Sequence, residues 1–407
     1  METSRRHFLL SSGAAVGSIV ATQTSFGASD TIQIGCIGTG GRCRRLMQSV
    51  NQVKGVQITA LCDVWEVARN EAKKLAPNAV VYDDFNELLA SKNVDAVVIG
   101  SPDHWHVPMT IAALKAGKDV YVEKPLTHSL AEGKAILDTL KAHPQIVQVG
   151  TQQRSMPHIQ EAKQLVEAGK IGEVLKVTMS WNRNTDRIRR FKDLAKLEQV
   201  NWKAFLGNAP DQKFDDYRMR NWRWFWDFGG GIFTDLMVHW VDVAHWILNV
   251  ESPVKAVSLG EHVASKGVWE TPDTVQTILQ YPNQLQMHFE GTFSNARHGA
   301  RIEFMGRDAT LYIDRGGYIL TPERNRKIEP SEKIIGKGPR GADFYNEPDG
   351  ELLHIQNWVD CIRSRKQPTA PISGGVHSAN AAHLANEALR KGGVATWEPE
   401  MKPKSSE

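Results

Sequence analysis

The stretch IGCIGTGGRCRRL, residues 34–46, decides the fold of the first part of the chain. An apolar run ending at Ile37 predicts a buried strand, and the segment from Arg42 onward predicts a helix. Gly38 and Gly40 lie between them. The first glycine permits a tight turn, and the second lets the backbone approach a pyrophosphate at the helix N-terminus. Strand, glycine turn and helix together predict a dinucleotide-binding unit.

Two neighbouring features refine this prediction. Cys43 stands where a third glycine is usual, and we expect Gly41 to loosen the turn in its place. Asp63 follows the second predicted strand, about 20 residues further on, where a carboxylate accepts a hydrogen bond from the ribose 2′-hydroxyl of NAD. Its charge would repel the extra phosphate of NADP, so NAD is the expected cofactor. The alternative is a doubly wound domain with an incidental glycine turn.

Outward from this stretch, short apolar strands alternate with helical segments across residues 31–150. This rhythm predicts a doubly wound parallel sheet, and therefore an α/β class. Residues 151–345 begin with a helical segment and continue mostly as strand-like runs with short turns, which predicts an α+β domain with a mainly antiparallel open sheet. Residues 346–397 read as helices that pack back on the body, and residues 398–407 read as a tail.

The first 28 residues have the order of an export signal. Arg5 and Arg6 precede a weakly hydrophobic run from Phe8 to Val20, and small residues follow. The arginine pair resembles a twin-arginine signal, which predicts export and a periplasmic location. The run is too short to span a bilayer. The alternative is an N-terminal tail with a chance arginine pair.

Composition narrows the function classes. Apolar residues make up 41% of the 407-residue chain and charged residues 23%, as in a soluble globular protein. A net charge of +3 without basic blocks argues against a nucleic-acid partner. The spacing of the four cysteines fits no zinc ligand set. Cys36 and Cys62 are expected near strand ends, either free or bridged to each other.

Two further stretches carry a family resemblance: SPDHWHVPMTIAALKAGKDVYVEKPLT at 101–127 and GGGIFTDLMVHWVDVAHW at 229–246. Together with GTQQRS at 150–155, they resemble the glucose-fructose oxidoreductase, inositol dehydrogenase and rhizopine-catabolism family (Gfo/Idh/MocA). The resemblance implies a Rossmann domain and a second domain whose open sheet packs against a partner subunit, hence a homo-oligomer. It places an active site where the two domains meet.

Three residues are candidates for catalysis. Lys124 follows the fifth predicted strand, at the sheet edge where such folds bind ligands, and the resemblance puts it beside the reacting oxygen and the cofactor. Asp235 and His239 are four apart and share a face of a predicted helix from about Ile232 to Leu248. His239 is the natural proton acceptor, oriented by Asp235. The alternative for such a helical pair is a surface or capping interaction.

The resemblance also assigns cofactor contacts to Ser101, His106 and Glu123. A zinc site built on His104 and His106 is rejected because no third ligand is evident, so no metal is expected.

Substrate contacts are expected from Arg154 at the domain junction, from Trp222, and from Asp242 on the same helical stripe as Asp235. Flat rings beside arginines suit the C–H faces and hydroxyls of a sugar. The other reading of the tryptophans near Trp222 is that they are core or interface, and we expect this of at least half of them.

Three functions remain open. The first is an exported NAD-dependent oxidoreductase that transfers hydride between a carbohydrate or polyol hydroxyl and the nicotinamide. The second is an NAD-dependent glycoside-cleaving enzyme that works by transient C3 oxidation and elimination, with a recycled cofactor. The third is a non-catalytic sugar-binding protein, against which the joint presence of Lys124, Asp235 and His239 argues.

Overall fold

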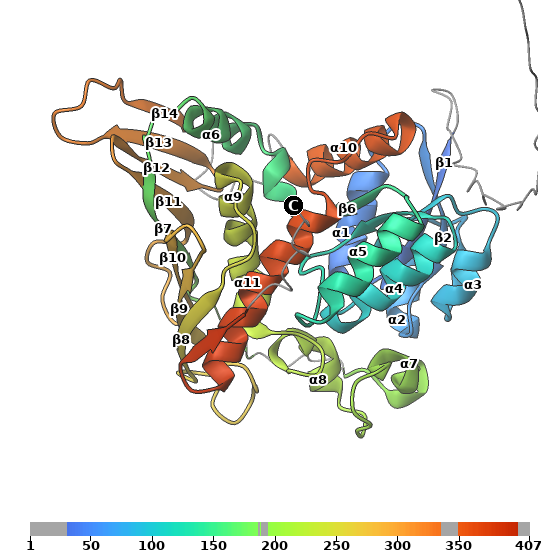
Figure 1. Cartoon of the computed structure of the whole chain (residues 1–407). Coiled ribbons are helices and arrows are strands. Elements are labelled where there is room, and N and C mark those ends of the chain that lie inside the picture. The colour runs from blue at the N-terminus through green and yellow to red at the C-terminus, as the bar shows by residue number, and fades with distance from the viewer. Residues whose placement is uncertain (1–30, 186–187, 189–193, 335–348, 398–407) are drawn as a thin grey trace, which may run out of the picture.

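The structure is a computed structural model that describes residues 31–185, 188, 194–334 and 349–397. It contains two sheets with helices between and around them (Figure 1). The predicted export signal and the tail at 398–407 lie outside the described residues.

The first domain is built on a six-stranded sheet in the order β3-β2-β1-β4-β5-β6, in which every neighbouring pair is parallel. This confirms the predicted doubly wound sheet. Its strands are buried by helices on both faces, which is why they read as continuous apolar runs. The strands are β1 (Ile32–Ile37), β2 (Val56–Cys62), β3 (Val80–Tyr82), β4 (Ala96–Ile99), β5 (Asp119–Val122) and β6 (Val147–Val149). The helices are α1 (Gly41–Val50), α2 (Glu66–Lys73), α3 (Phe85–Ala90), α4 (Asp103–Lys115) and α5 (Glu132–Ala142).

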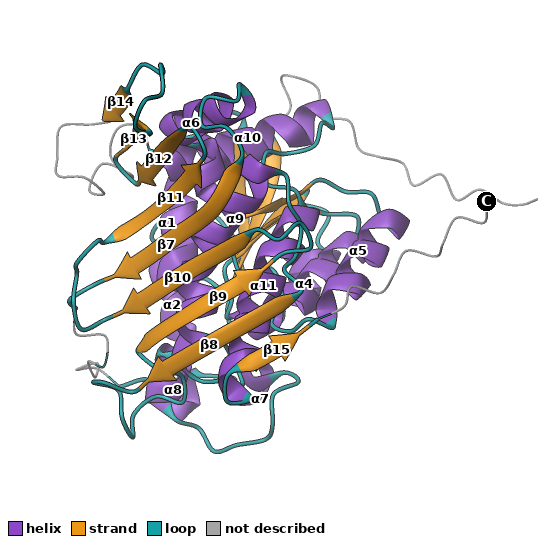
Figure 2. Ribbon diagram, turned by 60° about the vertical axis from the view of Figure 1, so that its left-hand side comes forward, coloured by secondary structure: helices purple, strands orange, loops and turns teal. Residues whose placement is uncertain are grey.

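The second domain carries a nine-stranded open sheet in the order β14-β13-β12-β11-β7-β10-β9-β8-β15 (Figure 2). Only β7 and β10 pair in parallel, so the predicted mainly antiparallel sheet is also confirmed. Its strands are β7 (Val174–Asn182), β8 (Lys255–Glu261), β9 (Thr274–Gln280), β10 (Gln286–Thr292), β11 (Ala300–Gly306), β12 (Ala309–Asp314), β13 (Gly317–Pro322), β14 (Ser331–Ile334) and β15 (Val394–Thr396).

Helices cover the inner face of this sheet, where alternate strand residues are buried in one apolar core. The main ones are α6 (Pro157–Glu167), α9 (Val238–Leu248) and α11 (Ile372–Arg390). Two short helices, α7 (Trp202–Leu206) and α8 (Asp216–Arg220), extend towards the first domain (Figure 1).

The last two helices connect the domains. α10 (Gly350–Ser364) contributes Ile355, Trp358 and Val359 to the core of the first domain. α11 packs on α9 and β8 of the second domain and also contacts α5 and β6 of the first. The carboxyl end of β5 is thereby held close to the start of α9, which creates the junction that carries the site.

Candidate active site at the domain junction

A cleft of about 740 Å³ runs along the carboxyl edge of the first sheet, and residues of both domains line it. Gly38 has φ +74°, and a Cβ there would lie 2.5 Å from the backbone nitrogen of Ser101, so only glycine fits. Cβ atoms at Gly40 and Gly41 would meet nothing within 4 Å, because these residues border the open cleft. The backbone at the start of α1 is therefore accessible to a pyrophosphate, and the cleft fits a dinucleotide.

Asp63 and Ser101 line the same cleft. One carboxylate oxygen of Asp63 accepts from the backbone nitrogen of Trp65 at 2.8 Å, and the other from the Thr39 hydroxyl at 3.4 Å. Burial raises the pKa of Asp63 to about 6, so its carboxylate is largely ionised at neutral pH. The Ser101 hydroxyl is buried and has no hydrogen-bond partner among the described residues. The structure therefore brings together Gly38, Gly40, Gly41, Asp63 and Ser101.

His106 lies behind the cleft wall. Its ring nitrogens face two backbone carbonyls, those of Pro125 at 2.6 Å and Ser101 at 3.0 Å, and the side chain is buried. In this position it supports the turn before α4 and the turn after β5. Both ring nitrogens of His106 are thus occupied by the protein backbone, and its predicted cofactor contact stays a prediction.

No group of three His, Cys, Asp or Glu side chains placed to hold a metal ion occurs within the described ranges. His104 turns to the carbonyl of Phe205 at 2.9 Å. All four cysteines are buried and free, so Cys36 and Cys62 are not bridged.

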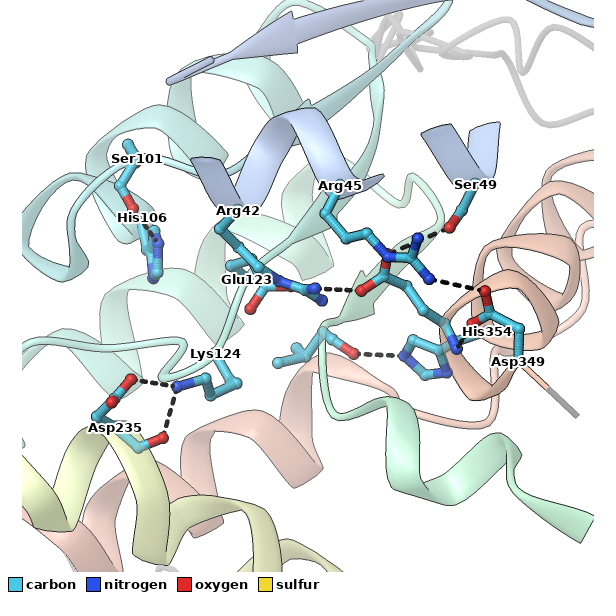
Figure 3. Close-up of polar contacts among 12 residues, drawn as sticks. Arg42, Arg45, Ser49, Ser101, His106, Glu123, Lys124, Asp235, Asp349 and His354 are labelled. Atoms are coloured by element: carbon cyan, nitrogen blue, oxygen red, sulfur yellow. Dashed lines mark hydrogen bonds and ion pairs between the residues drawn. The ribbon is translucent and has the colours of Figure 1, made fainter. Parts of the chain in front are cut away.

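Lys124 is the centre of a group of charged side chains that we call the lysine cluster: Asp103, Lys124, Arg223 and Asp235. The Lys124 ammonium donates to the backbone carbonyl of Asp235 at 2.7 Å and to its carboxylate at 3.0 Å (Figure 3). The Nε of Arg223 donates to the same carboxylate oxygen at 3.1 Å. The Lys124–Pro125 peptide is cis. These contacts join the end of β5 to the second domain.

The helix that carries Asp235 departs from the regular helix that the sequence predicts. It begins with a π-helical turn, Phe233–Met237, and becomes α-helical at Val238. A π turn moves the backbone hydrogen bonds one residue further along, which changes the pairing of the carbonyls within it. The carbonyl of Asp235 lies in this turn and accepts from Lys124, an arrangement that the sequence spacing did not reveal.

His239 is half-buried near Lys124. Its ring lies 5.1 Å from that of Trp181, centroid to centroid, and its Nδ1 has no hydrogen-bond partner in the part of the chain that the structure describes. Burial lowers the pKa of His239 well below its ordinary value, and the charges of Lys124 and Arg315 lower it further. The imidazole is therefore neutral at physiological pH.

A second hollow of about 390 Å³ is also lined by Trp181. The guanidinium groups of Arg183 and Arg315 lie 5.5 and 5.8 Å from the Trp181 ring centroid. Tyr312 also lines the hollow. The hollow therefore combines an aromatic ring with guanidinium groups and a phenol, and two of its lining residues, Trp181 and Arg315, also act on His239.

Sequence reasoning missed Asp103 and Arg223. Asp103 is buried at the first position of α4, and burial raises its pKa to about 8, against the opposing charges of Lys124 and Arg223. Asp103 follows Pro102 before a helix, and Arg223 separates two tryptophans. From the sequence, Asp103 was therefore interpretable as a residue that starts a helix, and Arg223 as a polar residue between two aromatic rings.

Arg154 and Asp242 bind each other. The Nε and one terminal nitrogen of Arg154 donate to the two carboxylate oxygens of Asp242, each at 2.7 Å, and both side chains are buried. The Arg154 guanidinium also donates to the carbonyl of Thr369. Each residue thus satisfies hydrogen bonds of the other, and their predicted contact with substrate stays a prediction.

Trp222 lines the dinucleotide cleft, with the guanidinium of Arg223 4.2 Å from its ring centroid. The neighbouring Trp224 is buried and stacks on Trp269 at 4.4 Å, while Trp181 and Trp202 also belong to the core. Trp181, Trp202 and Trp224 thus occupy core positions, while Trp222 borders the cleft.

Glu123, although adjacent to Lys124, belongs to a separate group that we call the arginine cluster: Arg42, Arg45, Glu123, Asp349 and Glu351. Figure 3 shows the first four of these residues. The carboxylate of Glu123 accepts from the Nε of Arg42 at 2.9 Å, and a terminal nitrogen of Arg42 lies 2.8 Å from the same oxygen. Glu351 forms ion pairs with Arg42 and Arg45 and accepts from the Ser49 hydroxyl. Glu123 is thereby directed to α1, and its predicted cofactor contact stays a prediction.

Comparison with known proteins agrees with this geometry. Residues 32–151 match the GFO_IDH_MocA oxidoreductase family with its NAD-binding Rossmann fold, and residues 159–312 match the GFO/IDH/MocA C-terminal domain. The chain is 25% identical to a scyllo-inositol 2-dehydrogenase (NAD(+)) of Bacillus subtilis over 321 residues, which span 76% of this chain and 80% of that protein. It is 37% identical to a glycosyl hydrolase family 109 protein of Solibacter usitatus over 162 residues, which span 35% of this chain and 37% of that protein.

A solved oxidoreductase from Agrobacterium radiobacter, in complex with NAD+, L-tartaric acid and magnesium, has the same fold. Its TM-score is 0.70 at 18% identity, over 90% of this chain and 98% of that one. The glycine-lined cleft, the two sheets and the two family matches lead to one conclusion: this chain belongs to the Gfo/Idh/MocA family of NAD-binding oxidoreductases.

Proposed function

We propose that the protein oxidises or reduces a secondary hydroxyl of a carbohydrate or polyol with NAD as cofactor. One observation carries the proposal: Lys124, at the end of β5, lies close enough to His239 for its charge to depress the pKa of that imidazole. We infer that a cationic N–H donor and a neutral base act together here; Arg223, which bonds the same Asp235 carboxylate as Lys124, lines the dinucleotide cleft. Relatives named as inositol dehydrogenases support a polyol-like substrate.

Each side chain has a separate task in oxidation. NAD, when bound, supplies the acceptor for the hydrogen on the alcohol carbon and its two electrons. The neutral imidazole of His239 takes the hydroxyl proton, which leaves a carbonyl. Two N–H bonds of Lys124 are held by Asp235, so the third is available to the substrate oxygen and stabilises the negative charge that develops there. Arg223 keeps the Asp235 carboxylate in place.

Trp181, which packs against His239, also lines the second hollow. That hollow offers an indole ring for C–H groups and nearby guanidinium groups for hydroxyls, the combination that a sugar or cyclic polyol requires. Trp222 and Arg223 border the cleft and complete the enclosure.

A substrate panel tests the proposal. Purified protein is mixed with inositols, anhydrosugars and aldoses, and nucleotide reduction is followed by absorbance, both for bound NAD and with NAD added. At least one class should reduce the nucleotide, and His239→Ala should lower the rate by at least about 100-fold. No reduction with any member, or an unchanged rate in the variant, would contradict the proposal.

A second candidate is cleavage of a glycosidic bond at the same site. The stretch shared with the glycosyl hydrolase family 109 protein favours it, although the match spans little more than a third of that relative. Oxidation at C3 of the sugar acidifies the neighbouring C–H, loss of that proton expels the glycosidic oxygen, and water addition followed by reduction restores both sugar and NAD. Release of free sugar from an aryl glycoside without net NADH would identify this reaction.

We also propose export by the twin-arginine route, on the basis of the Arg5–Arg6 segment, and a homo-oligomer formed through the outer face of the nine-stranded sheet. Val257, Leu259 and Ile278 are exposed on β8 and β9 of that face. Cell fractionation tests the location. Sedimentation of the protein and of Leu259→Glu tests the assembly, since an added charge on this face should dissociate it. Among the described helices, none is long and apolar enough to cross a membrane.

A further inference from the structure

The three glycines at 229–231, which we call the glycine segment, lead directly into the π turn that carries Asp235. The middle one, Gly230, is buried between two polar side chains. A Cβ there would lie 2.4 Å from the side chain of Thr234 and 2.8 Å from the side-chain nitrogen of Asn386. A glycine at this position therefore lets both side chains approach the backbone.

Both polar groups of the Gly230 backbone are bound by these side chains. The N–H donates to the Thr234 hydroxyl at 3.0 Å, and the carbonyl accepts from Nδ2 of Asn386 at 2.8 Å. Thr234 belongs to the π turn itself, whereas Asn386 lies 156 positions after Gly230 in the chain, on α11. Thr234 and Asn386 are both buried. These hydrogen bonds therefore fasten the start of the π turn to α11.

The π turn in turn holds Lys124. Its own hydrogen bond runs from the backbone N–H of Val238 to the carbonyl of Phe233, five residues earlier. Lys124 donates to the carbonyl of Asp235, inside the turn, at 2.7 Å. A π turn is rare because it replaces the regular bonding of the α-helix, so neighbouring contacts have to stabilise it. The hydrogen bonds at the glycine segment are such contacts, and through the turn they act on the place of the ammonium.

A second contact of the glycine segment leads to the same carboxylate. A Cβ at Gly229 would lie 2.9 Å from the Cα of Arg223, so the two backbones pack directly against each other. The Nε of Arg223 donates to the Asp235 carboxylate at 3.1 Å, and Lys124 donates to the same oxygen at 3.0 Å. The place of the glycine segment therefore affects both cations that bind Asp235.

From these contacts we infer that Asn386 is a positioning residue for the reaction. By holding the carbonyl of Gly230, it keeps the π turn in the shape that directs Lys124 to the substrate oxygen. Asn386 is not one of the described residues that line the dinucleotide cleft, so its effect passes through the backbone of the glycine segment and the π turn. This inference rests on the proposed function, which requires Lys124 beside the reacting oxygen.

Asn380 provides a matched control on the same helix. It is also buried, and its Nδ2 donates to the hydroxyl of Ser252 at 3.2 Å. Asn380→Ala and Asn386→Ala each remove one buried amide from α11, but only the second removes a bond to the glycine segment. A role in stability alone would give the same result for both variants, whereas a positioning role lowers turnover in Asn386→Ala only.

Steady-state kinetics are measured with the inositol, anhydrosugar or aldose that gives the fastest nucleotide reduction by the wild type. The kcat of Asn386→Ala should fall by about 10-fold while KM changes by less than about twofold, because a displaced lysine loses its contact mainly in the transition state. Asn380→Ala should keep the kcat of the wild type. The affinity for NADH, measured by fluorescence titration, should equal that of the wild type in both variants, since neither change touches the cleft.

The pH profile of kcat gives a second measurement. Burial is the main cause that lowers the pKa of His239, and the charged side chains that act on it are Lys124, Arg315 and Arg42, which lower the pKa further, and Asp235, which raises it. Displacing Lys124 raises this pKa. Because oxidation requires the neutral imidazole, Asn386→Ala should lose activity at a higher pH than the wild type on acidification, and Asn380→Ala should keep the profile of the wild type.

Should Asn386→Ala fail to fold, Thr234→Val decides, since it keeps the shape of the side chain and removes the hydroxyl that Gly230 binds. Its kcat should fall about fivefold, with the same shift of the pH profile. Equal losses of kcat in Asn380→Ala and the folded site variant, or an unchanged kcat or pH profile in the latter, would overturn the positioning role and leave the proposed function intact. A wild type that reduces the nucleotide with none of the compounds would overturn both.

Discussion

Glu123 and Lys124 are adjacent in the chain, yet they belong to two ionic clusters with different characters. Successive residues of an extended strand point to opposite sides, so the end of β5 sends Glu123 to the arginine cluster and Lys124 to the lysine cluster (Figure 3). Both clusters combine carboxylates with cations inside the protein. Their difference shows that residue type alone does not mark a catalytic group.

In the arginine cluster, every carboxylate is paired with an arginine of the same cluster. Glu351 is fully buried and shared by Arg42, Arg45 and Ser49, while Asp349 caps the start of α10 and also pairs with Arg45. It fastens α10 to α1, the helix whose start borders the cleft. We interpret it as a structural joint.

The lysine cluster, by contrast, leaves a hydrogen-bond donor unused. Lys124 retains an N–H beyond the two that Asp235 accepts, and the neighbouring His239 keeps a neutral ring whose Nδ1 has no partner among the described residues. Asp103 is held with a pKa of about 8, so much of it is protonated at neutral pH because burial disfavours the charged form. Hydrogen-bonding groups without a protein partner and shifted pKa values are typical of functional sites.

The largest effect is expected at Lys124. Lys124→Met keeps the length of the side chain but removes the donor and charge beside the reacting oxygen, so turnover should fall by about 10³-fold. The nucleotide content of the purified protein should stay near that of the wild type. Steady-state rates and nucleotide analysis check this result, and a loss smaller than tenfold would place the chemistry elsewhere.

A smaller effect, on stability, is expected from the arginine cluster. Glu351→Ala leaves two arginines and a serine without a shared acceptor, although Arg42 keeps Glu123 and Arg45 keeps Asp349. The free energy of unfolding should fall by about 2–3 kcal/mol, measured by denaturant titration, while turnover at low temperature changes little. Asp138→Ala, which removes a pair on the exposed face of α5, is the control and should leave the unfolding midpoint unchanged. If turnover of Glu351→Ala fell as far as that of Lys124→Met, the arginine cluster would also have a role in catalysis.

The smallest effect is a pH dependence at Asp103. Its pKa is raised from 3.8 to about 8 on folding, so the unfolded chain loses this proton first, and stability falls as the pH rises between these values. Asp103→Asn, which stays neutral, should therefore raise the melting temperature relative to wild type by roughly 2–4 °C at pH 8.5 and by less at pH 5. Equal differences at both pH values would show that Asp103 is ionised in the folded protein.

Much of the first domain could be predicted because its signals are local. The strand, the glycines and Asp63 lie within 32 residues of each other, and each has a fixed place in a strand-turn-helix-strand unit. The alternation of apolar residues likewise predicts the second sheet. The pairing of Arg154 with Asp242 could not be predicted, since the two residues are 88 positions apart and each looks like a polar group facing a ligand.

The sequence by itself determined the two sheets, the dinucleotide cleft and the candidates Lys124, Asp235 and His239, because these follow from periodicity and from short motifs. Only the tertiary structure decided which charged residues remain open to chemistry. It paired Glu123 with Arg42, joined Lys124 to a carbonyl in a π turn, added Asp103 and Arg223, and made residues of the second domain part of the cleft wall. The physical reason is that burial and bonding depend on neighbours distant in the chain, and these set whether a charged group is satisfied or reactive.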